Sequence, residues 1–406
     1  MGKMIIYLVY ICITLALSLA YDSREDSRQK RVWYGMNCLF LILVAGLRNG
    51  VGGDTLAYMD EYEYAPTGFT YLREYITDMM TENGYMPLWS TLMVVCHSLS
   101  EDFYLLQFVQ AAVVNITIFA IFRQYTQRIF LCALVYAVAG YFFLFNTEVL
   151  REGMAVAMSL IAIQHYFKGD KIRFGVFVLI GILFHVSAAV VLFFPLMRFI
   201  HLKWISVAWG LLAAFVLWFG SDMLVNHMPA FIENSQLAIA LKILKYSNLN
   251  SNIFGFLSNS LRYLCFPFFV MMYTLNEEKD ESLRERKEHL MAYMFIVGIL
   301  AIGLTGFARL RNYTEVYYLI ALSEFIYLYV RYPKNLLIAR TIVLAGVLFY
   351  GSLFYTAYYA SSHKHHYAYY FPYTSIMDEP DSYNFRYEMH DESVKMVEET
   401  ENTRTK

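Results

Sequence analysis

Four short polar segments interrupt long apolar stretches and contain the side chains that could do chemistry. The first, LRNGVGGDTLAYMDEY, spans residues 47–62 and follows an apolar block long enough to enter a membrane. Arg48 keeps its charge, which is costly near lipid unless it is paired. The three glycines permit positive φ angles and can turn successive backbone amides toward an anion. We expect an anion-binding turn with Asp54 beside it, pairing with Arg48, binding a sugar hydroxyl or acting as a base. The simpler alternative is an arginine at a helix end followed by a glycine turn.

A second arginine, Arg151, lies at the start of an apolar helix in FNTEVLREGMAVAMSL, residues 145–160. Glu148 and Glu152 are four residues apart and share one helix face, and Glu148 lies three residues before Arg151. Arg151 therefore either binds a ligand or balances the local acidic charge.

The third segment, GILFHVSAAVVLFFP, places His185 in the middle of an apolar block. An ionisable side chain there needs a partner, and Ser187 is too near in sequence to meet it across a turn of continuous helix. His185 is either structural or a base or ligand contact, because its ordinary pKa of about 6.5 suits proton transfer.

The fourth segment, GFARLRNYTEVYYL, carries Arg309 and Arg311 between two apolar blocks. Paired guanidinium groups suit bidentate binding of phosphate or pyrophosphate. The alternative is that they are ordinary cytoplasmic anchors and the assumed topology is inverted. If all four segments face the same side, they predict a pocket for an anionic headgroup at the membrane surface.

Composition sets the class of protein. Of 406 residues, 58% are hydrophobic and 16% are charged, which excludes an ordinary soluble domain. Apolar blocks of about 17–24 residues match a ~30 Å hydrocarbon core. The sequence predicts an all-α, polytopic membrane protein with about ten to twelve transmembrane helices, the first of them uncleaved. The five cysteines lack metal-type spacing, no cofactor or metal motif is present, and no nucleic-acid partner is expected.

The chain is predicted to form one transmembrane domain, residues 1–360, followed by an aromatic and then acidic tail, 361–406, that is partly disordered. The loops rich in lysine and arginine are 21–31, 123–128, 168–173, 276–289 and 331–340. Placing these basic loops in the cytoplasm puts the long loops 48–84 and 220–260 outside. It also requires that 85–99 is re-entrant and that 174–197 is broken near Gly181 and His185. The histidines of SSHKHH, residues 361–366, are expected to be solvated rather than metal-bound.

Several of these motifs in combination resemble the EpsG family of bacterial exopolysaccharide, capsule and O-antigen proteins, related in role to Wzy polymerases. The resemblance covers about residues 40–376. It is carried by GLRNGVGGDTLAYMDEY, LREGMAVAMSLIAIQHYFKGDKIRF, LFHVSAAVVLFFPL, RLRNY and YYFPYTSI. Departures from the family pattern are Gly53, usually a small hydroxyl residue, and Thr55, often aromatic. The matching positions are Arg48, Gly52, Asp54, Tyr58, Arg151, Gly153, His185, Ser187, Arg309, Arg311 and Tyr313.

The resemblance implies a fold similar to GT-C-type glycosyltransferase membrane folds, in the bacterial cytoplasmic membrane. It implies a polymerase that acts on polyprenyl-pyrophosphate-linked oligosaccharide at the outer face, without a metal, with other polysaccharide export and chain-length proteins as partners. Arg48, Gly52, Tyr58, Arg151, Arg309 and Arg311 would bind substrate, and Asp54 or His185 would be the base. The alternatives are a lipid-linked sugar flippase, a membrane acyltransferase, or a ligase that joins finished polymer to a lipid acceptor.

Overall fold

The computed structural model describes residues 5–82, 84–226, 253–331, 369–370 and 372–388. Every regular element in these ranges is helical, and the one β-bridge among them joins Arg48 to Ser375. The all-α prediction is confirmed for this part of the chain. The chain divides into two compact units, residues 1–154 with 327–406, and residues 155–326. Helices α9 and α16 each run from one unit into the other.

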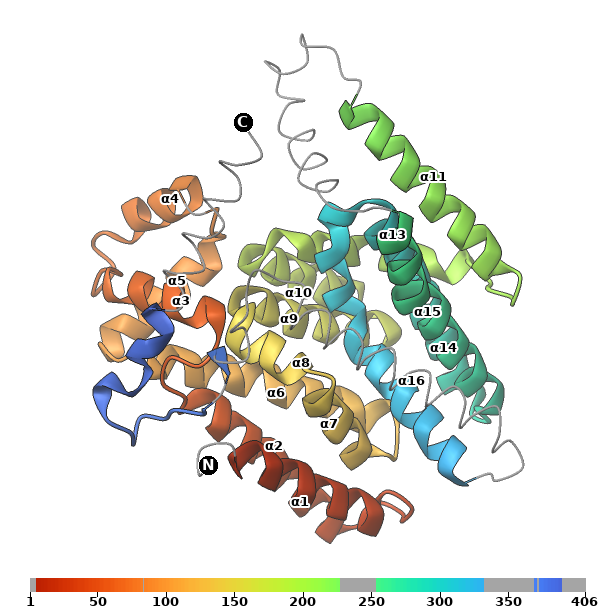
Figure 1. The fold of residues 1–406 in the computed structure, drawn as a ribbon, viewed down its shortest axis with the longest axis horizontal. Coiled ribbons are helices and arrows are strands. Elements are labelled where there is room, and N and C mark those ends of the chain that lie inside the picture. The colour runs from red at the N-terminus through yellow and green to blue at the C-terminus, as the bar shows by residue number, and fades with distance from the viewer. Residues whose placement is uncertain (1–4, 83, 227–252, 332–368, 371, 389–406) are drawn as a thin grey trace. The chain divides into compact units, whose positions relative to one another are not determined.

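Unit 1 begins with the apolar helices α1 and α2 and contains the glycine-rich turn (Figure 1). Its elements are α1 (Ile5–Tyr21), α2 (Arg28–Gly46), α3 (Gly53–Glu63), α4 (Leu72–Glu82), α5 (Pro87–Leu99), α6 (Tyr104–Tyr125), α7 (Ile129–Val138), α8 (Tyr141–Phe143), the π-helix η2 (Leu144–Glu148), the start of α9 (Leu150–Phe167) and η9 (Pro380–Tyr383).

Helices α2 and α6 pack in antiparallel directions and define the two ends of unit 1. Near one end, the Tyr34 hydroxyl donates to the carbonyl of Phe119 over 2.9 Å. Just beyond, the Lys30 ammonium donates to the carbonyl of Gln127 over 2.9 Å, so two basic loops meet. At the other end, Gly46 packs so closely on Phe108 that an added Cβ would lie 2.7 Å from its ring. The glycine turn follows this second end.

Helices α7 and α8 with η2 form a bent path between the same two ends. The Asp22 carboxylate accepts from the Leu131 amide over 2.8 Å at the first end. Gly140, at φ 83°, then allows a bend of 79°. Within η2, the buried Asn146 side chain accepts from Asn115 over 2.7 Å and donates to the Tyr136 hydroxyl over 3.1 Å. This polar network anchors the π-helix whose last residue is Glu148.

Helix α5 does not cross unit 1. Near its start, Trp89 meets the ring of Tyr58 edge-on, with centroids 5.5 Å apart. Just past its end, the Ser100 carbonyl accepts from the Tyr62 hydroxyl over 2.8 Å. Both ends of α5 therefore lie against α3. Its 13 residues span about 20 Å at 1.5 Å each, short of a ~30 Å core. This agrees with the expectation that 85–99 is not a simple crossing.

A late segment of the chain docks beside the glycine turn. The Asn49 amide donates to the Thr374 carbonyl over 2.8 Å, and the Gly52 amide to the Tyr369 carbonyl over 2.9 Å. Arg386 is fully buried and donates to the Thr374 hydroxyl over 2.6 Å and to the Pro372 carbonyl. We call residues 369–370 and 372–388 the docked tail.

Unit 2 contains the rest of α9 and the start of α16. Its other elements are α10 (Lys171–Phe184), the 3-10 helix η3 (Val186–Phe199), α11 (Ser206–Asn226), α13 (Ile253–Ser260), the π-helix η5 (Leu261–Cys265), α14 (Phe266–Glu277), α15 (Glu281–Gly303), the 3-10 helix η6 (Thr305–Arg311) and α16 (Asn312–Arg331). Helix α15 packs against α11, α14, η3 and η6 and forms the centre of this unit.

The block 174–197 is broken, as the sequence predicts. Helix α10 begins where the Asp170 side chain accepts from the Arg173 amide over 3.0 Å. It ends at Phe184, because His185 is extended, with φ −157° and ψ 125°. The chain then continues as η3, which contains Pro195. An added Cβ on Gly181 would lie 3.2 Å from Ala188, so the glycine lets η3 fold close to α10.

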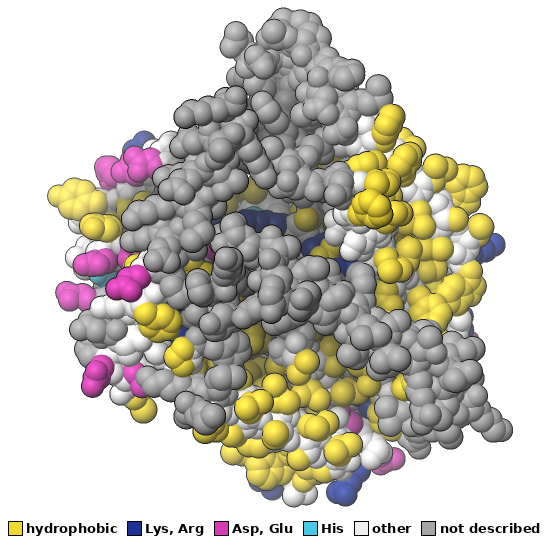
Figure 2. Space-filling model, viewed as in Figure 1, with side chains coloured by type: hydrophobic (Ala, Val, Ile, Leu, Met, Phe, Trp, Pro, Cys, Tyr) yellow, Lys and Arg dark blue, Asp and Glu magenta, His cyan; other side chains and the backbone are white. Residues whose placement is uncertain are grey.

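The described surface carries apolar stripes of the kind that face lipid. On α2, Val32, Met36, Leu39 and Leu43 are all exposed at helical spacing, while the opposite face is buried. Figure 2 shows apolar side chains gathered over α1 and α2, whereas acidic side chains gather on the α3–α5 side of unit 1. Apolar stripes without a partner indicate contact with another apolar phase.

By length and hydropathy, two helical stretches among the described residues suffice to cross a bilayer. They are Tyr104–Tyr125 and Ile253–Glu277, and a third span results if Ile129–Val138 and Tyr141–Glu148 are one bent span. The predicted total of ten to twelve is larger. Several sequence predictions lie outside the described residues: most of loop 220–260, the SSHKHH histidines and the acidic end of the tail.

Candidate active site

Arg48 is buried beneath the glycine turn, with 1% of its surface exposed. Its Nε donates to the Val51 carbonyl over 3.1 Å, Nη1 donates to the Ala45 carbonyl, and Nη2 donates to the Thr55 hydroxyl over 3.3 Å. Burial lowers the pKa of the guanidinium to about 10, so it stays charged at neutral pH. The structure thus places Arg48 as a support of the turn, without contact to solvent.

The turn above Arg48 requires glycine at two positions. Gly52 has φ 113°, and an added Cβ would lie 2.5 Å from the Thr147 carbonyl oxygen. Gly50 has φ 61°, and there a Cβ would meet the ring of Tyr383 from the docked tail at 2.5 Å. The glycines predicted to permit positive φ do so, and they also allow two other segments to approach the backbone.

The amides exposed by this turn bind an anion that belongs to the protein. The Glu148 carboxylate accepts from the Gly53 amide over 2.8 Å and from the Asp54 amide over 3.3 Å. These are the first amides of α3, where the helix dipole favours negative charge. The Tyr370 hydroxyl also bonds to Glu148, and burial is the main cause that raises the pKa of this phenol.

Both departures from the family pattern contribute to this arrangement. An added Cβ on Gly53 would lie 3.2 Å from Oε2 of Glu148, a tight approach that glycine avoids. The Thr55 hydroxyl donates to the Thr147 carbonyl over 2.8 Å and also accepts from Arg48. Thr55 therefore links the buried guanidinium to the π-helix that carries Glu148.

Arg151 is half-buried between aromatic rings at the start of α9. Its guanidinium carbon lies 3.6 Å from the centroid of Tyr85, and Nε donates to the Tyr58 hydroxyl over 3.2 Å. Within the described residues, neither Nη1 nor Nη2 donates a hydrogen bond. Arg151 is therefore positioned by cation–π contact while both terminal amino groups remain available to a ligand.

Glu61 extends the network around Arg151. Its carboxylate accepts from the Tyr85 hydroxyl, whose ring stacks on the Arg151 guanidinium. Burial raises the pKa of Glu61, and the bond from Tyr85 and the charge of Arg151 oppose the shift. Asp54, Tyr58 and Glu61 are spaced four and three residues apart on α3, so this helix presents all three on one side.

The Asp54 side chain lies in the first turn of α3 and is exposed, and Glu148 accepts from the backbone amide of the same residue. The structure thus brings together five of the predicted residues in unit 1: Arg48, Gly52, Asp54, Tyr58 and Arg151. The sequence interpretation missed Glu61 and Tyr85, and it did not assign Glu148 to the turn. The spacing of Asp54, Tyr58 and Glu61 was the signal that could have identified Glu61.

His185 contacts Ser187 in unit 2, so the sequence argument against this pair is wrong. The helix breaks between α10 and η3, and Nδ1 of His185 meets the Ser187 hydroxyl at hydrogen-bond distance. The Ser187 hydroxyl also lies 2.9 Å from the hydroxyl of Tyr313, which is buried at the start of α16. The three side chains form a chain that can orient the imidazole and relay a proton.

Arg309 and Arg311 lie at the end of η6, near Tyr313 in sequence. Arg309 is exposed. Arg311 is half-buried, with its guanidinium carbon 3.3 Å from the centroid of Tyr263, and Nη1 is 3.9 Å from a Glu315 oxygen. In unit 2, η6 packs against η3, the element that follows His185.

Among the described residues, no group of three or more histidine, cysteine or acidic side chains could hold a metal ion. The described side chains offer anion binding by arginine and proton transfer by Asp54, Glu61 or His185.

Comparison with known proteins connects this geometry to a family. A family model described as the EpsG family matches residues 31–375. No curated protein and no solved structure is significantly similar to the chain. The match includes every candidate residue described above and agrees with the extent of the resemblance in the sequence. The chain belongs to the EpsG family, which indicates a membrane protein with a role in polysaccharide polymerisation.

Proposed function

We propose that this protein polymerises oligosaccharide repeat units linked to a polyprenyl pyrophosphate, at the outer face of the bacterial cytoplasmic membrane. Family membership supports the polymerase role. The observation that carries the site is Arg151, which two tyrosines position while both of its Nη groups are left without an acceptor among the described residues. A diphosphate offers oxygens at the spacing that the two Nη groups of a guanidinium can bind together.

In this proposal, a sugar hydroxyl of one lipid-linked unit attacks the anomeric carbon of another. A new C–O glycosidic bond forms as the bond from that carbon to the pyrophosphate oxygen breaks. Asp54 or His185 accepts the hydroxyl proton, and free polyprenyl pyrophosphate departs with the bonding electrons. In unit 1, Arg151 stabilises the charge that grows on the leaving group, so the step is proposed to need no metal. In unit 2, Arg309 and Arg311 are proposed to bind substrate.

The other predicted residues take supporting roles. Arg48 and Gly52 shape the turn that places Asp54 and Glu148, and Tyr58 holds Arg151 through its hydroxyl. The outer face in this proposal is the end of unit 1 that contains the turn, because the basic loops with Lys30 and Arg128 meet at the opposite end. We also propose that the chain crosses the membrane ten to twelve times and that this membrane is the inner membrane.

Reconstituted protein should extend lipid-linked repeat units in the presence of EDTA. Arg151→Ala is expected to lower turnover by about 10²–10³-fold, the loss typical of one preorganised donor to a developing oxyanion. Arg151→Lys keeps the positive charge but loses the planar guanidinium that binds two oxygens at once. Its rate should therefore lie between those of Arg151→Ala and wild type. Arg173, an exposed arginine on α10, provides the control, and Arg173→Ala should leave turnover unchanged. Full activity of Arg151→Ala, or loss of activity with EDTA alone, would overturn the proposal.

A further inference from the structure

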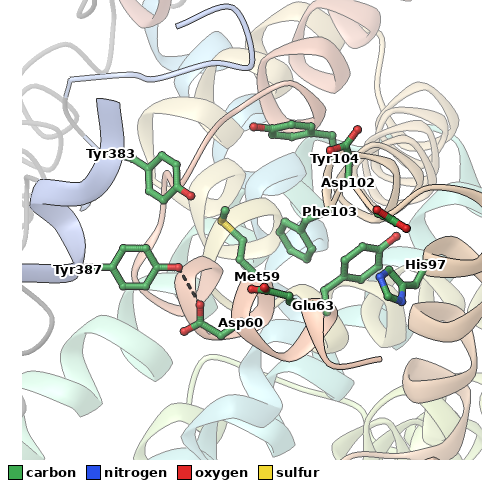
Figure 3. Close-up of a pocket in the computed structure, with 11 residues that line it drawn as sticks. Met59, Asp60, Glu63, His97, Asp102, Phe103, Tyr104, Tyr383 and Tyr387 are labelled. Carbon is green, nitrogen blue, oxygen red and sulfur yellow. Dashed lines mark hydrogen bonds between the residues drawn. The ribbon is translucent and has the colours of Figure 1, made fainter. Parts of the chain in front are cut away.

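Unit 1 contains a pocket of about 540 Å³ whose lining includes none of the predicted catalytic or substrate-binding residues. Such a volume lies within the range of about 300–1,000 Å³ typical of ligand pockets. Figure 3 shows Tyr383 and Tyr387 of the docked tail on one side, and Tyr104 and Asp102 on the other. Residues of α3 form the wall between them.

Aromatic rings line both sides of this pocket. Tyr62 and Phe103 are buried, with their centroids 5.5 Å apart, and Tyr104 lies beside them at the start of α6. Tyr383 and Tyr387 are half-buried, with centroids 5.9 Å apart. Rings that flank an open pocket and carry hydroxyl groups can pack on the C–H faces of sugars and bond to their hydroxyls.

Besides His97, the titratable groups of the pocket other than tyrosine are all acidic. Its lining includes Asp60, Glu63, Glu101 and Asp102, all exposed, and no lysine or arginine. One of these carboxylates is held in place, because Asp60 accepts from the Tyr387 hydroxyl over 2.8 Å. Carboxylates of this kind accept hydrogen bonds from sugar hydroxyls, attract ammonium groups and repel other carboxylates.

We propose that this pocket is a glycan-binding site that accepts neutral or amine-bearing oligosaccharide and discriminates against uronic acids. The proposal rests on the proposed function only in assigning the bound glycan to the polymerase's own substrate or product. The docked tail supplies the two tyrosines of one wall, and its position is set by Arg386 and by the contact of Tyr383 with Gly50.

The test measures binding of three hexasaccharides of similar length to the full-length protein in detergent. The probes are chitohexaose, which is neutral, its fully deacetylated form, which is cationic, and hexagalacturonate, which is anionic. The deacetylated probe should bind most tightly and hexagalacturonate most weakly, and added salt should reduce the difference. Equal or tighter binding of hexagalacturonate, compared with chitohexaose, would overturn the proposal.

Variants then assign binding to this pocket. Tyr383→Ala and Tyr104→Ala should each weaken chitohexaose binding by about two- to tenfold, whereas Tyr64→Ala, at an exposed tyrosine outside the pocket, should not. The Glu63→Gln, Asp102→Asn double variant should shift the ratio of cationic to neutral affinity toward one. This ratio is measured within one protein sample and is therefore insensitive to a loss of folded material.

The matched control is Asp78→Asn, Glu82→Gln, two exposed acidic residues of α4 that do not line the pocket. An unchanged ratio in the pocket double variant, or an equal change in the control, would overturn the assignment. These measurements need no polymerase activity. Loss of chain extension in Arg151→Ala with unchanged hexasaccharide binding would confirm that the two sites are separate.

Discussion

The Glu148 carboxylate accepts a 2.8 Å hydrogen bond from the amide of Gly53, a residue 95 positions earlier in the chain. This contact joins the end of η2 to the first turn of α3. The same short stretch, residues 144–151, ends with Arg151, so the capping carboxylate and the available guanidinium are positioned by one backbone segment. A disturbance of the cap should therefore reach the anion-binding arginine.

Replacing Glu148 separates its hydrogen-bonding role from its charge. Glu148→Ala leaves the Gly53 and Asp54 amides without their acceptor and should destabilise the protein by about 1 kcal/mol, as for a lost helix cap. Glu148→Gln retains an acceptor oxygen and should lose only the interaction with the helix dipole. Thermal unfolding in detergent should rank wild type above Gln above Ala. Three equal midpoints would contradict the cap.

Gly52 should tolerate no side chain. Gly52→Ala combines a φ of 113° with a Cβ 2.5 Å from a backbone oxygen, so we expect a loss of more than about 3 kcal/mol. Gly68 has a φ of 79° with open space around it, and Gly68→Ala should cost only about 1–2 kcal/mol. The comparison of unfolding midpoints isolates the close approach of Thr147. Similar losses in both variants would mean that this approach is relaxed in solution.

The Glu61 carboxyl group should make the folded protein less stable as the pH rises through the range in which this group loses its proton. Burial raises its folded pKa above the ordinary 4.5, so the folded protein binds this proton more tightly than the unfolded chain. The stabilisation is present below the unfolded pKa and is lost as pH passes through the folded pKa. Glu61→Gln should remove this slope and keep the bond from Tyr85. Unfolding midpoints of wild type and Glu61→Gln, measured between about pH 4 and 8, test this prediction. Parallel curves of midpoint against pH for the two proteins would contradict the raised pKa of Glu61.

The His185–Ser187–Tyr313 chain should affect turnover more than substrate binding. Ser187→Ala removes the hydroxyl that contacts the imidazole, and we expect kcat to fall about tenfold while KM stays within about twofold. Ser159→Ala is the control, because that hydroxyl bonds to a carbonyl of its own helix. Wild-type kcat in Ser187→Ala would exclude a catalytic role for the chain.

Local patterns in the sequence predicted the features that depend on neighbouring residues. The glycines after Arg48 indicated an anion-binding turn, and Gly181 with His185 indicated a broken helix. Both are present, because positive φ and helix breaks are determined over a few residues. The same logic failed for Ser187, since continuous helix was assumed across the break.

Features that depend on distant pairing could not be predicted. Nothing near Gly53 indicates that its anion is Glu148, and Arg386 stands in a polar segment with no local sign of burial. Arg48 was expected to contact ligand, whereas in the structure its guanidinium donates to the Val51 and Ala45 carbonyls and to the Thr55 hydroxyl. Hydropathy identified the apolar blocks. It did not show how long the helices within them are, because bends such as the one at Gly140 divide an apolar block into shorter helices.

The docked tail constrains how the chain is threaded through lipid. The Ile376 amide donates to the Leu47 carbonyl over 3.0 Å, and the Asn49 amide donates to the Thr374 carbonyl. Groups in such contact lie on the same side of a membrane, so if the chain between them crosses a bilayer, it does so an even number of times. The bond between Gly53 and Glu148 sets the same condition for residues 54–147. A membrane insertion scheme with an odd number of crossings between Gly53 and Glu148 is therefore incompatible with this contact.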